Sequence, residues 1–263
     1  MMRRTVCMIR DFHGNVIQID KRGAEYPVDA LLTEVDGKDV LILSARVFFV
    51  PFQIPIGVKI QPWKQNILEG FRQWSGRYQV FGGQDLEVRV DIKEVDSYDD
   101  AVLVWTADKS VEKTVLDVIS REVDLWLDSG KTFTDVGAKD ELDWKPHLPK
   151  SIHFARWTLN QPNLVTKIAK HEFGHVLGVG SVYRDIRKGL KGIHVNDQLK
   201  DLKAHYLGYH KFNCVMESGG PVSNNDIEMV ILAFFTEEYQ QYQLVRGRGK
   251  VSEAVGKGNY RRK

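Results

Sequence analysis

The sequence predicts an α+β fold, in which a mixed β-sheet is covered by helices. Within residues 86–92 apolar and polar side chains alternate, which is typical of a half-buried strand. Within residues 63–74 apolar side chains recur every three or four positions, as they do on one face of a helix. Segments of both kinds alternate along the 263 residues. We therefore expect a twisted mixed sheet with helices packed against it.

The first part of the chain, residues 1–60, is predicted to be an N-terminal extension of β-hairpins. His13-Gly14-Asn15 and Asp36-Gly37-Lys38 each lie between two short apolar runs, and such Gly-containing dipeptides favour tight turns. Prolines at positions 51, 55 and 62 indicate an extended passage after these hairpins. We accordingly place a domain boundary near residue 60, a main domain over residues 61–245 and a basic, disordered tail over residues 246–263.

The main domain begins with segments that can be assigned from their periodicity. In order, we expect a helix over 63–74, strands over 86–92 and 101–105, a helix over 111–127, a polar surface loop over 130–150 and a strand over 151–157. The double glycine Gly82-Gly83 separates the first helix from the strand that follows it. The result is a layer of strands with helices between them.

A helix over residues 164–178 contains the most informative residues of the chain. Asn163, after Pro162, is the expected N-cap, and Gly178 is the expected stop. His171 and His175 are four residues apart, so a helix places both imidazoles on one face. Two imidazoles in this arrangement can bind one zinc ion. Glu172 can take a proton from a water at that metal, which zinc makes more acidic.

The last structured segment is predicted to be a second long helix. Ser223-Asn-Asn-Asp226 is similar to a capping box, and apolar side chains at 227, 230, 231 and 234 share one helical face. We expect this helix to end around Gln243. Between the two helices, Val215-Met216 precedes a flexible Ser-Gly-Gly-Pro segment.

Taken together, these residues resemble the metzincin clan of zinc metalloproteases. The clan pattern is His-Glu-x-x-His-x-x-Gly-x-x-His or Asp, followed by a methionine-containing turn below the metal. This chain has His171-Glu172-x-x-His175-x-x-Gly178, and Met216 is similar to the methionine of that turn. The resemblance implies a zinc-dependent endopeptidase with a metzincin-like domain. It also implies that the strand from Ile152 to Trp157 is the substrate-binding edge strand, with Ile152 and Phe154 contacting a peptide.

At the position of the third zinc ligand this chain has Ser181, where the clan has His or Asp. A neutral hydroxyl is a poor zinc ligand. Asp185 is our first choice as third ligand, and three later histidines are alternatives: His194, His205 and His210. Ser181, or a water that it holds, is another way to fill the position. A further alternative is a catalytically degenerate relative that binds zinc weakly or not at all and acts as a binding or structural module.

Composition and charge restrict the partners. The tail has seven basic residues against one glutamate, a net charge of +6, so the formal charge of +2 for the whole chain leaves −4 for the rest. This tail is the only feature that favours nucleic acid, and a solvated, disordered end explains it more simply. Neither a secretory signal nor a membrane span is expected, which favours residence in the cell or export without a leader. We expect a monomer with a peptide or protein substrate, and two reduced thiols at Cys7 and Cys214.

Overall fold

The fold was analysed in a computed structural model, which describes residues 8–11, 14–21, 26–51, 56–106, 132–137, 144–180, 215–218 and 220–240. The elements in these ranges are β1 (Val28–Val35), β2 (Lys38–Phe49), α1 (Ile60–Arg72), β3 (Gly76–Val80), β4 (Gln84–Glu94), β5 (Val102–Trp105), β6 (Phe133–Asp135), β7 (Lys150–His153), a 3₁₀ helix (Arg156–Asn160), α4 (Pro162–Val176), α7 (Val215–Ser218) and α8 (Asn224–Thr236). These helices and strands confirm the expected α+β class. The predicted helix over 111–127, both cysteines and the tail lie outside the described residues.

The seven described strands form one mixed sheet. Its order is β3-β4-β2-β5-β7-β6, and β1 pairs with β2 beside this path. Strand β2 runs parallel to both β4 and β5, and β5 runs parallel to β7. The remaining pairs, β1 with β2, β3 with β4, and β6 with β7, are antiparallel.

The β1–β2 hairpin is an integral part of this sheet. The turn Asp36-Gly37 was predicted correctly, and both residues have the positive φ angles, 52° and 72°, that a two-residue hairpin turn requires. Strand β2, however, lies in the middle of the sheet, and its buried side chains belong to the same hydrophobic core as those of α1 and α4. This corrects the predicted division near residue 60, because the strands before and after it share one sheet and one core.

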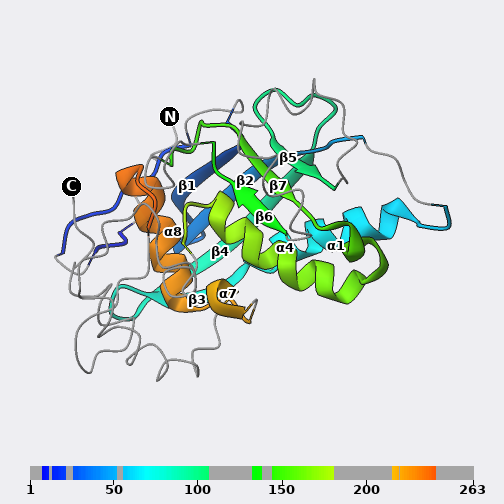
Figure 1. Cartoon of the computed structure of the whole chain (residues 1–263). Coiled ribbons are helices and arrows are strands. Elements are labelled where there is room, and N and C mark those ends of the chain that lie inside the picture. The colour runs from blue at the N-terminus through cyan, green and yellow to red at the C-terminus, as the bar shows by residue number, and fades with distance from the viewer. Residues whose placement is uncertain are drawn as a thin grey trace, which may run out of the picture.

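Helices α1 and α4 pack side by side against the sheet, with α8 next to the C-terminal end of α4 and α7 below α4 (Figure 1). Gly70 of α1 is in close contact with α4: a Cβ atom there would lie 2.5 Å from the Thr166 carbonyl oxygen and 2.8 Å from the Ala169 Cβ. Further along, the rings of Phe71 and Phe173 stack with centroids 4.5 Å apart. The two helices thus contact each other over much of their length, which fixes α4 on the sheet.

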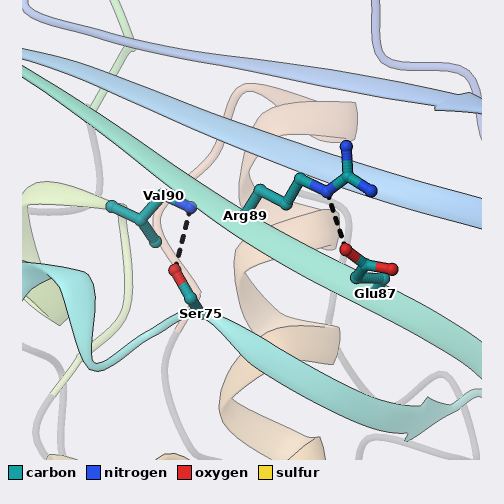
Figure 2. A network of polar contacts seen from close by, with 4 residues as sticks. All are labelled: Ser75, Glu87, Arg89 and Val90. Carbon is teal, nitrogen blue, oxygen red and sulfur yellow. Dashed lines mark hydrogen bonds and ion pairs between the residues drawn. The ribbon is translucent and has the colours of Figure 1, made fainter. Parts of the chain in front are cut away.

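Strand β3 and the chain just before it cover the outer edge of β4. The pairing of β3 with β4 ends at Gly76 and Val88. Ser75 then continues the contact, since its hydroxyl accepts the Val90 N–H at 3.0 Å (Figure 2). On the same strand, the Arg89 Nε donates to the Glu87 carboxylate at 2.7 Å. Strand β3 was missed by the sequence analysis, although Tyr78 and Val80 alternate with the polar Arg77 and Gln79, because five residues show too little of a period to stand out.

Several predicted boundaries change in the structure. Helix α4 begins at Pro162, so its N-cap is Gln161 and not Asn163. The capping box at Ser223 and Asp226 is confirmed, but α8 ends at Thr236, where Glu237 adopts a left-handed conformation with a φ of 56°. Strand β6 lies within the segment predicted to be a loop. No helix in the described ranges combines the length and the apolar character that crossing a membrane requires.

Candidate metal centre

The three predicted site residues of α4 lie together at the C-terminal end of that helix. His171, Glu172 and His175 are each less than 8% exposed. Helix α4 begins with Pro162 at its first turn, where the missing N–H of proline costs no hydrogen bond. It ends before Gly178, whose φ of +87° is a conformation that glycine adopts without strain. These local features place both imidazoles on the last two turns.

Two tryptophans hold this part of α4 from outside. The Trp74 Nε1 donates to the Lys170 carbonyl oxygen at 2.8 Å, and the Trp144 Nε1 donates to the Val176 carbonyl oxygen at 3.1 Å. Val176 is the last residue of α4, and its carbonyl has no N–H partner four residues on within the helix, so the Trp144 donor satisfies a group that would otherwise be buried unpaired. The Trp74 donor reaches a carbonyl further back in the helix. The end of the helix is therefore fixed by side chains on either side of the histidine pair.

The orientation of both imidazole rings is set by backbone carbonyls. The Nδ1 of His171 lies 2.8 Å from the Val215 carbonyl oxygen, and the Nδ1 of His175 lies 2.8 Å from the Val179 carbonyl oxygen. A carbonyl oxygen can only accept, so each Nδ1 carries the proton and each neutral ring has its lone pair on Nε2. The ring centroids are 4.9 Å apart, with the ring planes at 89°. This is the tautomer in which Nε2 can bind a metal.

His175 is kept in its neutral form. Its pKa is lowered to about 3, mainly by burial and also by the neighbouring His171, while the hydrogen bond to the Val179 carbonyl acts in the opposite direction. A histidine must be neutral to donate a lone pair to a metal ion. At physiological pH, His175 is already in the required state.

Glu172 points toward strand β6. The Thr134 hydroxyl of that strand donates to the Glu172 Oε2 at 2.5 Å. Burial raises the pKa of Glu172, while the electrostatic interaction with His171 and the Thr134 hydrogen bond lower it. The net result is a carboxyl group with a pKa above its ordinary value, which suits a group that must accept and release a proton near neutral pH. Thr134 was missed because its segment was interpreted as a polar loop, although Thr132-Phe133-Thr134 is a β-favouring run.

Met216 packs directly against α4. It is fully buried on α7, and a Cβ atom at Gly174 would lie 2.3 Å from its sulfur. Gly174 is the residue just before His175, so the methionine lies against the helix between the two histidines. The neighbouring Val215 supplies the carbonyl that accepts from His171. Helix α7 therefore contributes both a hydrogen-bond acceptor and a packing surface to the histidine pair.

The expected substrate-binding strand is not at the edge of the sheet. Strand β7 pairs with β5 on one side and with β6 on the other, and Ile152 and Phe154 are fully buried. A peptide cannot add to a strand that is paired on both sides, so the prediction for β7 is wrong. Among the described strands, β6 is the terminal strand at this end of the sheet. Its Thr134 is the residue that contacts Glu172.

The described residues contain two of the predicted metal ligands, His171 and His175. Within them, no group of three or more His, Cys, Asp or Glu side chains is arranged to hold a metal ion. Ser181, Asp185 and the three alternative histidines at 194, 205 and 210 all lie outside the described residues. The two histidines nevertheless fit zinc by donor type, because both are neutral imidazoles with Nε2 as the lone-pair nitrogen.

Comparison of the chain with models of protein families, with curated proteins and with solved structures gave no match.

Proposed function

We propose that the protein is a zinc-dependent endopeptidase of metzincin type. The observation that carries the proposal is the hydrogen bonding of the histidine pair: both Nδ1 atoms donate to backbone carbonyls at 2.8 Å. Such partners fix the tautomer and the ring orientation of metal-binding histidines. The buried Glu172 beside them and the mixed α+β fold are consistent with the proposal.

His171 and His175 would hold the metal, and Glu172 would move the proton. Zinc, when bound, supplies Lewis acidity that activates a water and polarises the scissile carbonyl. Glu172 then accepts a proton from the attacking water as its oxygen bonds to the carbonyl carbon. When the C–N bond breaks, Glu172 delivers that proton to the leaving amine. Thr134 holds the carboxyl group in place through both steps.

A peptide substrate would extend along β6. Strand β6 is next to Glu172 and is terminal among the described strands of the sheet. An extended peptide can add to such a strand through main-chain hydrogen bonds. This replaces the assignment of the substrate contacts to Ile152 and Phe154, which are buried in the core.

The test combines metal content and peptide cleavage. The purified chain should contain about one zinc ion, and Glu172→Gln should retain the metal while losing a factor of roughly 10²–10⁴ in the rate of cleavage of a peptide library. A chain with fewer than about 0.1 zinc ions would instead be a degenerate, non-catalytic binding module. Cleavage that is unchanged in the Glu172→Gln variant would remove the proposed base.

The third ligand is tested in the same assay by removing each candidate in turn. Zinc content should fall in Asp185→Ala if our first choice is right, and it should stay unchanged in the three histidine variants His194→Ala, His205→Ala and His210→Ala. Loss of zinc in one histidine variant alone would transfer the assignment to that residue. Removal of residues 246–263 should leave cleavage unchanged, because the basic tail takes no part in the proposed reaction.

A further inference from the structure

The chain that follows α8 returns to the histidine pair. After the left-handed Glu237, Tyr239 and Gln240 run beside the residues that leave α4. The Gln240 N–H donates to the Gly178 carbonyl oxygen at 2.8 Å, and the Gly180 N–H donates to the Gln240 carbonyl oxygen at 2.8 Å. Two backbone hydrogen bonds thus join the C-terminal segment to the chain just before position 181.

Tyr239 reaches the metal-binding histidine itself. Its hydroxyl oxygen lies 3.2 Å from the His175 Nδ1, the same atom that lies 2.8 Å from the Val179 carbonyl oxygen. The Nδ1–H group therefore has two acceptors, one from the backbone and one from a side chain 64 residues away. Tyr239 is 6% exposed, so this contact is shielded from water. Two acceptors at one N–H restrict rotation of the ring more than one acceptor does.

The same segment is anchored at its other end. The Lys145 Nζ donates to the Glu237 carbonyl oxygen at 2.7 Å, just before Tyr239. At Gly178 there is no room for a side chain, because a Cβ atom would lie 2.9 Å from the Ala233 Cβ of α8 and 3.0 Å from the Trp144 ring. The exit from α4 and the C-terminal segment are therefore held against each other by packing and by hydrogen bonds.

We propose that Tyr239 is a positioning residue of the metal centre, which aligns the His175 ring for zinc while Gln240 holds the chain that leaves α4 at Gly178 and Gly180. This inference rests on the proposed function. An acceptor at Nδ1–H increases the electron density on Nε2 and holds the ring in the binding orientation. Partners of this kind typically contribute 10–100-fold to metal affinity. Since the Val179 carbonyl remains when the hydroxyl is removed, we expect an effect near the lower end of that range.

The experiment is a zinc competition titration of the full chain against a chromophoric chelator. Tyr239→Phe removes one oxygen and keeps the ring, and its zinc dissociation constant should rise about tenfold. The control is Tyr98→Phe, which removes a hydroxyl from an exposed tyrosine whose ring contacts Phe48 of β2. The control should bind zinc as the wild type does. Cobalt absorption spectra should show a changed ligand field in Tyr239→Phe only, which a general loss of stability would not cause.

The outcomes separate the two proposals. If the wild-type protein binds zinc and Tyr239→Phe has the same zinc dissociation constant, the role of Tyr239 is overturned and the proposed function stays intact. Wild-type protein that binds no zinc would overturn both. If Tyr239→Phe does not fold in the metal-free state, Lys145→Met takes its place, because it loosens the same segment through Glu237. A smaller loss of zinc affinity is then expected, and an unchanged affinity would overturn the role.

Discussion

Glu228 should make the protein less stable as the pH rises toward neutrality. Its side chain on α8 is 5% exposed, and its Oε1 accepts the Phe81 N–H at 2.7 Å. Its Oε2 is buried and has no hydrogen-bond partner among the residues that the structure describes. Burial raises the pKa of Glu228 to about 7 from an ordinary value of 4.5, and the Phe81 hydrogen bond opposes this rise. The protonated form is therefore favoured in the folded state.

The magnitude follows from the two pKa values. A carboxyl group with a higher pKa when folded contributes stability that is fully present below its unfolded pKa and is lost as the pH rises through its folded pKa. For Glu228 this window runs from 4.5 to about 7. Each unit of pKa difference corresponds to about 1.4 kcal/mol, so above that window the ionised group lowers the free energy of unfolding by about 3 kcal/mol.

Glu228→Gln isolates this effect. The amide keeps an oxygen for the Phe81 N–H and carries no charge at any pH. Both proteins are unfolded with urea at several pH values. The free energy of unfolding of the variant, relative to that of the wild type, should increase by about 2–3 kcal/mol between pH 5 and pH 8. Glu69→Gln, at an exposed site on α1, is the control and should change the free energy of unfolding by less than about 0.5 kcal/mol at every pH. A difference between Glu228→Gln and wild type that stays constant with pH would refute the reasoning.

Two further predictions concern the histidine pair. Thr134→Val removes a hydrogen bond that lowers the pKa of Glu172, so the acidic limb of the pH profile of kcat/KM should move to higher pH. Thr134→Ser keeps the hydroxyl and should leave this limb in place. A Thr134→Val profile equal to that of the wild type would contradict the role of Thr134. Gly174→Ala would put a Cβ atom 2.3 Å from the Met216 sulfur and should lower the free energy of unfolding by about 1–3 kcal/mol. In a double-mutant cycle, adding Met216→Ala to Gly174→Ala should recover part of the lost free energy of unfolding. Strictly additive effects would show that the new methyl group and the Met216 side chain do not clash.

Features that depend on a few neighbouring residues were predictable from the sequence. The Asp36-Gly37 turn, the Gly178 stop and the capping box at Ser223 and Asp226 are all present. Each is a backbone conformation or hydrogen bond within four residues, so the local amino-acid types decide it. The juxtaposition of His171 and His175 belongs to the same class, because the period of the helix alone brings the rings together.

Strand positions were less predictable. The buried residues of β7 suit an edge or an interior strand equally well, and only the pairing with β6 decides between them. Strand β6 is three residues long, too short to show a period, so its place next to Glu172 could not be inferred. Likewise, nothing within residues 28–49 distinguishes a separate hairpin from the centre of a larger sheet, because that depends on partners beyond residue 84.

The sequence by itself determined which side chains are the candidates for binding a metal and moving a proton, since a helix with His171, Glu172 and His175 presents them whatever surrounds it. Only the tertiary structure decided how those groups are held. The acceptor for the His171 ring comes from Val215, 44 residues further along the chain, and the second acceptor for the His175 ring comes from Tyr239, 64 residues further along. The partner of Glu172 comes from Thr134, 38 residues before it. These contacts depend on how the helices and strands pack, and packing is a property of the whole core rather than of any one segment.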